Sequence, residues 1–212
     1  MAEGAMNQTE MSQAELWDAR YRSHEAPWDP EPNPILEAEA TGLAPGKVLE
    51  VGCGEGSDAV WLARRGWQVM AVDISQVALD RGRQAAPDAS VEWRQADIMS
   101  WEPPTEAFDL VAAHFLHFIP ADRAVAFGRL ARAVKPGGRL LYVTHHPLDL
   151  QTTLRRPPNP EVLHTAEAVA ALLEPNDWEI LAQDARPRLV KDADGNPVTA
   201  HDAVLSARRL PG

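Results

Sequence analysis

The sequence has a single cysteine and no long apolar segment. Because Cys53 is the only cysteine among 212 residues, an internal disulfide bond is excluded. No apolar run reaches the roughly eighteen residues that a membrane-spanning helix needs. The opening residues, MAEGAMNQTEMSQ, lack the basic and apolar regions of a secretory signal. We therefore expect a cytoplasmic protein that has no membrane partner.

Positive charge is also scarce. The chain carries 20 Lys and Arg residues against 31 Asp and Glu residues, a formal net charge of -11. Binding to nucleic acid through the overall field needs a basic footprint, because phosphates repel an acidic surface. The sequence therefore predicts no nucleic-acid partner, whereas an acidic balance does not repel a cationic ligand.

Short apolar runs alternate with amphipathic segments through most of the chain. Strands that alternate with helices of this length form a parallel sheet covered on both faces. The predicted strands cover residues 47–51, 67–73, 90–97, 108–115 and 138–146. The predicted helices between them cover residues 57–66, 75–86 and 120–134.

The C-terminal third has a different pattern. One more helix is predicted over residues 163–174, followed by two strands joined by a turn around Asp194-Gly195-Asn196. Two consecutive strands with no helix between them form an antiparallel pair. One strand of the sheet is therefore expected to run against the others.

A glycine-rich loop follows the first predicted strand. In VLEVGCGEG the three glycines have GxGxG spacing, and Glu50 precedes them. The NAD fingerprint is GxGxxG, and its pyrophosphate binds backbone N–H groups at the positive end of a helix. Here the third glycine comes one position early, and the carboxylates of Glu50 and Glu55 oppose a phosphate. The loop therefore favours a nucleoside-like ligand with positive charge over a dinucleotide.

S-adenosylmethionine fits this description, because it joins a nucleoside to a sulfonium and an ammonium group. VLEVGCGEG, VMAVDIS and QADI resemble motifs I, II and III of the class I S-adenosylmethionine-dependent methyltransferases, over residues 48–145. The resemblance implies an α/β fold: a Rossmann-like, doubly wound, seven-stranded sheet, mostly parallel with one antiparallel strand near the C-terminus. It implies one methyltransferase domain over residues 35–212.

The resemblance also implies which residues bind the cofactor. Glu50 would orient the loop and the ammonium group, Asp73 would accept hydrogen bonds from the ribose hydroxyls, and Asp97 would take the adenine amino group. The thiol in the loop is not expected to be a nucleophile, because it lies inside the cofactor site. The residues of these motifs assigned to the cofactor are Glu50, Gly52, Cys53, Gly54, Gly56, Asp73, Ile74, Asp97 and Ile98.

Histidines follow the fourth and fifth predicted strands, at the sheet edge where ligands bind. A hydroxyl or amine acceptor must lose a proton, which a histidine can take, whereas a thiol needs mainly positioning and desolvation. His114 is the first candidate for this base and also a candidate cofactor contact, followed by His117 and His145. Polar lining or core packing is the alternative. The His-x-x-His and His-His pairs make a metal site an alternative, but none is predicted, because His145 and His146 would point to opposite faces of a strand.

The N-terminal segment resembles the small-molecule methyltransferases of the thiopurine, halide/thiol and tellurite-resistance group. LWDARYRSHEAPWDPEPNPIL carries Trp17, Tyr21 and Trp28 in the pattern of a helix and loop that lie over the cofactor. Aromatic faces attract a sulfonium through cation–π interactions, and simple packing onto the sheet is the alternative. The resemblance implies an N-terminal helix and lid segment over residues 1–34.

These observations predict S-adenosylmethionine-dependent methyl transfer to a small-molecule acceptor, with a slight preference for a thiol or other soft nucleophile. O-, N- or C-methylation of a secondary metabolite is the alternative. An NAD-type oxidoreductase is disfavoured by the glycine spacing, and a non-catalytic cofactor-binding protein by the intact loop. The stretch after the fifth strand, HHPLDLQTTLRRPPNPEVLHT, matches no acceptor motif, so the acceptor stays open.

Overall fold

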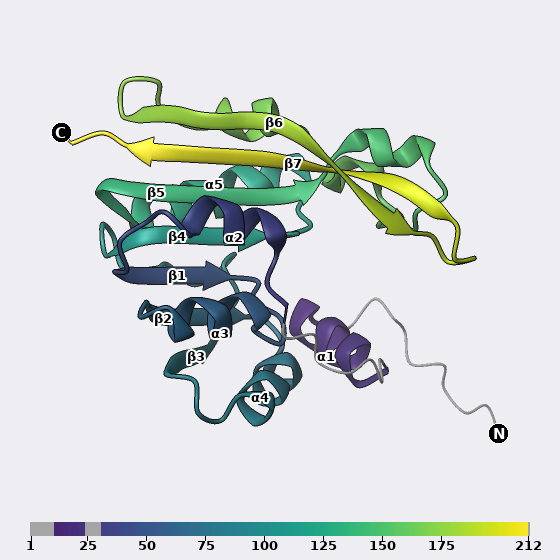
Figure 1. Cartoon of the computed structure of the whole chain (residues 1–212), viewed down its shortest axis with the longest axis horizontal. Coiled ribbons are helices and arrows are strands. Elements are labelled where there is room, and N and C mark those ends of the chain that lie inside the picture. The colour runs from purple at the N-terminus through teal and green to yellow at the C-terminus, as the bar shows by residue number, and fades with distance from the viewer. Residues whose placement is uncertain (1–10, 24–30, 212) are drawn as a thin grey trace.

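A seven-stranded sheet forms the centre of the computed structural model, which describes residues 11–23 and 31–211 (Figure 1). The strand order is β3-β2-β1-β4-β5-β7-β6. Strands β1 to β5 are parallel, and β7 is antiparallel to both of its neighbours. The predicted fold class, with one reversed strand near the C-terminus, is confirmed. The strands are β1 Lys47–Val51, β2 Gln68–Asp73, β3 Val91–Gln95, β4 Phe108–His114, β5 Val134–His145, β6 Trp178–Lys191 and β7 Pro197–Arg209.

Helices cover both faces of this sheet, with α2 and α3 in front and α5 behind in the view of Figure 1. One apolar cluster joins Leu49 and Phe127 on the α5 face, and the other joins Leu36 and Leu62 on the α2 and α3 face. In the described ranges every helix is too short or too polar to cross a membrane. The helices are α1 Gln13–Ser23, α2 Pro34–Ala40, α3 Ser57–Arg64, α4 Gln76–Ala85, α5 Pro120–Ala133 and α6 Ala166–Ala170, with 3-10 turns η1 Pro147–Gln151 and η2 Pro160–Val162.

The central position of β1 explains its apolar sequence. It pairs with β2 on one side and β4 on the other, so its side chains are buried on both faces of the sheet. Its residues Val48, Leu49 and Val51 join the two apolar clusters. Glu50 is the exception: its carboxylate is buried at 3% exposure, which is costly unless it has a function or a partner.

Two predicted boundaries were wrong. The helix expected over residues 163–174 is only Ala166–Ala170, because Leu163 is extended and the Thr165 side chain, which accepts from the Ala168 N–H, caps the start of the helix. Strand β5 begins at Val134 instead of residue 138, so the segment expected to end α5 already pairs in the sheet.

The turn between β6 and β7 was predicted correctly. Both the Asp194 and Asn196 N–H groups donate to Asp192 Oδ1, and Gly195 adopts a left-handed φ of 84°. The turn end of the hairpin extends beyond the end of β5 (Figure 1), and β7 contacts η1.

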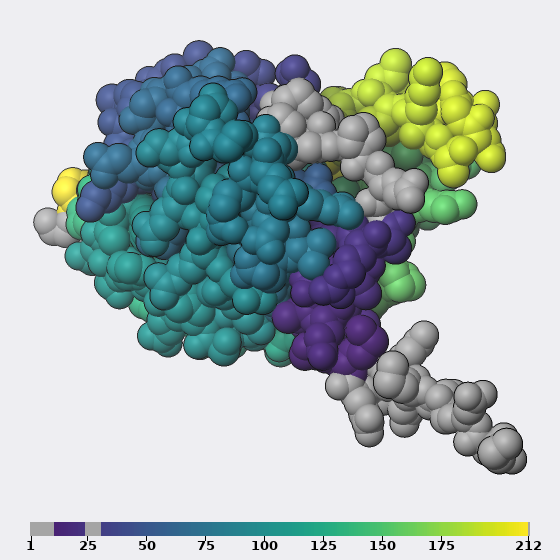
Figure 2. Space-filling view, turned by 90° about the horizontal axis from the view of Figure 1, so that it is seen from below, coloured from purple at the N-terminus to yellow at the C-terminus, as the bar shows by residue number. Residues whose placement is uncertain are grey.

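Helix α1 docks at the carboxyl edge of the sheet, next to α4 (Figure 2). The Asp18 Oδ1 atom accepts hydrogen bonds from Ser75 Oγ at 2.6 Å and from the Val77 N–H at 3.2 Å. No residue of α1 is fully buried. Its position therefore depends on these polar contacts and on ring contacts more than on a shared apolar core.

Candidate functional site

A cavity of about 680 Å³ lies at the carboxyl ends of β1, β2, β3 and β4, under α1. This is the edge where ligands bind in open parallel sheets, and the volume is in the range of small-molecule sites. Gly54 and His145 are not among its lining residues, and Trp28 lies outside the described residues. The predicted residues that do line it are Trp17, Tyr21, Glu50, Gly52, Cys53, Gly56, Asp73, Ile74, Asp97, Ile98, His114 and His117.

The glycine loop turns tightly between β1 and α3. Gly54 and Gly56 have left-handed φ values of 55° and 80°. A Cβ on Gly54 would lie 2.8 Å from the Tyr21 hydroxyl oxygen, and a Cβ on Gly56 would lie 2.2 Å from the Trp93 ring. Side chains at these positions would therefore push away α1 and β3, so the glycines allow the loop to pack as well as to bend.

Cys53 lies within this loop and is buried. Burial, followed by the charges of Glu50 and Asp73, raises the pKa of its thiol well above the usual value. A thiol is a nucleophile only as the thiolate, so the expectation that Cys53 is not catalytic has a physical basis.

Asp73 ends β2 and is fixed by the backbone around it. Its Oδ2 atom accepts from the Gly54 N–H and its Oδ1 atom from the Ser75 N–H, both at 2.8 Å. Asp97, after β3, accepts from the Met99 N–H at 2.8 Å. Both carboxylates keep lone pairs for further donors, as ribose hydroxyls and an amino group would be.

Three buried carboxylates surround the inner end of the cavity: Glu50, Asp58 and Asp73. Among the described residues, Glu50 Oε2 has no hydrogen-bond partner. Burial, followed by the charges of Asp58 and Asp73, raises the pKa of Glu50 well above its usual value. A cation placed here would reverse that effect, because opposite charge favours the ionised carboxylate.

Glu55 was expected to add to this negative charge, but the structure pairs it with Arg81. The Glu55 Oε1 atom lies 3.1 Å from Arg81 Nη1. Its charge is therefore partly compensated, although Glu55 also lines the cavity, and Asp58 is a further carboxylate there.

Sequence reasoning missed a buried pair between Asp58 and His114. Asp58 Oδ2, in the first turn of α3, lies 2.7 Å from His114 Nδ1 at the end of β4. Its other oxygen accepts from the Asn33 N–H at 2.6 Å. With Nδ1–H donating to the carboxylate, the lone pair of His114 resides on Nε2, which has no partner among the described residues. An acidic residue in a first helical turn is common, so nothing in the sequence singled out Asp58.

The other two predicted histidines belong to a stack of rings. His117 lies between Trp17 and His145, with ring centroids 6.4 Å and 5.7 Å away, and His145 packs on Phe115 at 4.6 Å. Burial, followed by the charge of Arg156, lowers the pKa of His145 to about 3. His145 is therefore neutral near pH 7. Its ring packs against the His117 ring, and it does not line the cavity. Within the described ranges, no group of three or more His, Cys, Asp or Glu residues is arranged to hold a metal ion.

Comparisons with known proteins agree with this geometry. Residues 48–138 match a family model described as a methyltransferase domain. An uncharacterized methyltransferase of Mycobacterium tuberculosis is 45% identical over 98 residues, which cover 46% of this chain and 49% of that protein. A probable thiol methyltransferase 2 of Arabidopsis thaliana is 32% identical over 134 residues, which cover 59% of each protein. The chain thus matches only about half to three fifths of the length of these relatives.

A solved structure gives wider coverage. It comes from work on the conversion of a disulfide bond into a thioacetal group during echinomycin biosynthesis, and it superposes with a TM-score of 0.74 at 25% identity. The superposition covers 94% of this chain and 92% of that chain. The motifs, the sheet order and these similarities lead to one assignment. Residues 48–138 form a methyltransferase domain with the motifs and sheet order of the class I S-adenosylmethionine-dependent methyltransferases.

Proposed function

We propose that this protein transfers a methyl group from S-adenosylmethionine to a small-molecule acceptor. The observation that carries the proposal is the group of buried carboxylates Glu50, Asp58 and Asp73 around one end of the cavity. S-adenosylmethionine brings a sulfonium and an ammonium group to such a site, whereas NAD would bring a pyrophosphate. The carboxylates therefore favour the first ligand and oppose the second.

The residues at the strand ends suit the parts of this cofactor. Asp73 would accept the ribose hydroxyls and Asp97 the adenine amino group, with Ile74 and Ile98 on the two sides of the ring. Glu50 would face the ammonium group. The geometry that supports this arrangement is the common cavity and the fixed orientation of Asp73.

Residues 1–34 would form a lid segment and residues 35–212 the methyltransferase domain. Trp17 and Tyr21 line the cavity from α1, and Asp18 holds this helix to the start of α4. The aromatic faces would exclude water and attract the sulfonium.

When bound, the cofactor supplies an activated methyl carbon, which the acceptor atom attacks while the C–S bond breaks and its electron pair goes to sulfur. For a hydroxyl or amine acceptor, His114 Nε2 would take the proton. Asp58 would hold the Nδ1–H and stabilise the imidazolium that forms. A thiolate acceptor needs no such base, only positioning and exclusion of water.

We favour a thiol or another soft nucleophile as acceptor. Support comes from the similarity to the Arabidopsis protein named as a probable thiol methyltransferase and from the apolar wall that Phe118, Ile119 and Val162 add to the cavity. O-, N- or C-methylation is the second candidate, and the Asp58–His114 pair is the observation that favours it.

Thermal denaturation with separate ligands tests the cofactor. At a ligand concentration about 100-fold above Kd, S-adenosylmethionine and S-adenosylhomocysteine should each raise Tm by about 5–10 °C, and NAD should not. Asp73→Asn should reduce both shifts, and Asp80→Asn on exposed α4 should not. Stabilisation by NAD without stabilisation by S-adenosylhomocysteine would overturn the proposal.

A panel of thiols, phenols and amines with methyl-labelled cofactor tests the acceptor class. If the favoured class is correct, thiols should be methylated most rapidly, and His114→Gln should leave that rate nearly unchanged. A preference for phenols or amines that His114→Gln abolishes would select the second candidate instead.

A further inference from the structure

Three buried polar side chains gather beside the acceptor end of the cavity. Arg123 comes from the first turn of α5, Tyr142 from β5, and His164 from the segment after η2; their exposed fractions are 7%, 2% and 4%. The rings of Tyr142 and His164 are 5.7 Å apart. Among the described residues, Arg123 Nε, Tyr142 Oη and His164 Nε2 have no hydrogen-bond partner. Unpaired buried polar atoms are costly, so three in one place call for an explanation.

Arg123 is a buried cation to which the described part of the chain supplies no acidic partner. Its Nη2 atom donates to the Phe118 carbonyl at 3.1 Å and to the Glu161 carbonyl at 2.7 Å. None of the described residues places a carboxylate within ion-pair distance of it, even though Asp122 precedes it in the chain. Two carbonyls satisfy part of its donor capacity but leave its charge uncompensated, and a buried charge normally has a counter-ion.

The cluster lies directly behind the cavity wall. Phe118 and Val162 both line the cavity. The Phe118 carbonyl accepts a hydrogen bond from Arg123 Nη2, and the Val162 carbonyl accepts one from His164 Nδ1 at 3.0 Å. Arg123, Tyr142 and His164 do not line the cavity themselves, so an acceptor would reach them only where the Phe118 or Val162 side chain moves aside.

Arginines lie near the acceptor end of the cavity, although Asp122 also lines the cavity. The buried carboxylates Glu50, Asp58 and Asp73 surround the cofactor end. At the other end, burial is the main cause that lowers the pKa values of His117 and His164, and nearby arginines lower them further. Arg123 acts on His164, which has a pKa of about 4, and Arg20 and Arg156 act on His117.

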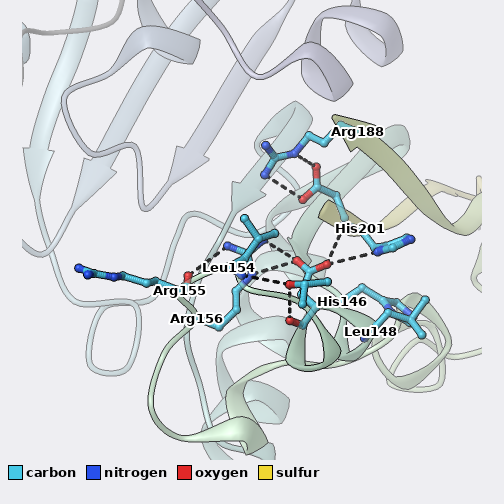
Figure 3. A network of polar contacts seen from close by, with 10 residues as sticks. His146, Leu148, Leu154, Arg155, Arg156, Arg188 and His201 are labelled. Carbon is cyan, nitrogen blue, oxygen red and sulfur yellow. Dashed lines mark hydrogen bonds and ion pairs between the residues drawn. The ribbon is translucent and has the colours of Figure 1, made fainter. Parts of the chain in front are cut away.

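Two other arginines in this region already have acidic partners. Arg156 Nε donates to the buried Asp149 at 2.9 Å and Arg188 Nε donates to Asp202 at 2.6 Å (Figure 3). The His201 N–H also donates to Asp149, so this network ties η1 to β7 and fixes the loop after β5. Unlike Arg156 and Arg188, Arg123 has no carboxylate partner within residues 11–23 and 31–211.

We propose that the methyl acceptor carries a carboxylate, which binds Arg123 Nε–H and the Tyr142 hydroxyl while the nucleophilic atom faces the cofactor. This inference rests on the proposed function, because it assigns the acceptor site of the same reaction. A carboxylate here would neutralise the buried guanidinium and satisfy two unpaired donors. An anion would also stabilise the protonated form of His164, in which Nε2 becomes a third donor.

Matched pairs of ligands test this inference in the full chain saturated with S-adenosylhomocysteine. The probes are 3-mercaptopropionate against 3-mercaptopropionamide and 4-hydroxybenzoate against 4-hydroxybenzamide, titrated by calorimetry. The carboxylate member of at least one pair should bind about ten- to a hundredfold more tightly than its amide, as expected for a charge-assisted hydrogen bond. Equal binding within both pairs, or no binding of either carboxylate, would overturn the inference.

Variants then locate the effect. Arg123→Met should abolish the preference for the carboxylate and leave S-adenosylhomocysteine affinity unchanged, whereas Arg132→Met, on the exposed face of the same helix, should change neither. Retention of the preference in Arg123→Met would overturn the inference. If Arg123→Met does not fold, Tyr142→Phe decides: a severalfold loss of carboxylate binding supports the inference, and unchanged selectivity overturns it.

The cofactor titration separates this inference from the function on which it rests. Failure of the proposed function would appear as no binding of S-adenosylhomocysteine by the wild-type protein. Failure of the inference alone would leave that binding intact and remove only the carboxylate preference.

Discussion

His114 Nδ1 lies 2.7 Å from Asp58 Oδ2, although the two residues are 56 positions apart in the chain. The contact joins the end of β4 to the first turn of α3 and leaves Nε2 of this buried imidazole, which lines the cavity, without a hydrogen-bond partner among the described residues. Because Asp58 also accepts from the Asn33 N–H, the same carboxylate links this imidazole to the start of α2.

Asp58→Asn tests whether this contact supports proton transfer. We expect the variant to methylate phenols about 10²- to 10⁴-fold more slowly, the range that a general base contributes, and thiols at nearly the wild-type rate. Initial rates with labelled cofactor at saturation measure both. Asp80→Asn, on the exposed side of α4, is the matched control. Equal losses for phenol and thiol would assign Asp58 a purely structural role.

Glu50→Gln should stabilise the protein without ligand while weakening its cofactor. Burial raises the folded-state pKa of Glu50, so its contribution to stability is present below the unfolded pKa and is lost as the pH rises through the folded pKa. The variant should therefore gain about 2–4 °C in Tm near pH 8, as expected for roughly 1 kcal/mol in a chain of this size, and much less near pH 4.

The cofactor affinity of Glu50→Gln should change in the opposite direction. S-adenosylmethionine should bind roughly tenfold more weakly, and S-adenosylhomocysteine should be affected less because it lacks the sulfonium charge. Calorimetric titrations of both ligands provide the comparison, with Glu92→Gln on the exposed surface of β3 as control. A lower Tm near pH 8, or equal loss of both ligands, would contradict this account.

Asp18→Ala should detach α1 from the start of α4. Because no residue of α1 is fully buried, Tm without ligand should fall by less than about 2 °C, whereas S-adenosylhomocysteine should bind roughly tenfold more weakly. Limited proteolysis of α1 should become faster. Glu15→Ala on the same helix removes only a contact to Ser12 and is the control. Unchanged cofactor affinity would show that the docking of α1 is not needed for binding.

Replacement of His145 should reduce the sensitivity of the fold to acid. Its pKa is lowered to about 3 by burial and then by Arg156, so its stabilising contribution is present above the unfolded value near 6.5 and is lost as the pH falls toward 3. Between pH 6 and pH 4, the free energy of unfolding of His145→Phe should therefore fall by about 1 kcal/mol less for each pH unit than that of the wild-type protein. Urea titrations at several pH values measure this slope.

His146→Gln serves as the control for that series, because it changes the adjacent histidine outside the ring stack. A wild-type slope in His145→Phe would mean that other groups carry the acid sensitivity, with His164 the next to test.

The sequence by itself determined the sheet and brought most of the predicted cofactor residues to one cavity. Strand and helix periodicity, the turn at Gly195 and the GxGxG loop are local properties, set by residues within a few positions of each other. Asp73 and Asp97 follow from the same logic, since the carboxyl ends of parallel strands meet at one edge. Their presence in one cavity could therefore be predicted before any contact was known.

Only the tertiary structure decided which side chains meet across elements. In the folded chain Asp58 contacts His114, Glu55 forms an ion pair with Arg81, and the His145 ring stacks on the His117 ring. The tertiary structure also brought Arg123 Nη2 into hydrogen-bond contact with the Phe118 and Glu161 carbonyls. These contacts connect residues far apart in sequence, and they depend on how helices pack on the sheet and on which buried charges find a partner. Local pattern does not encode that pairing, because the same residue types are equally common on solvent-exposed helix surfaces.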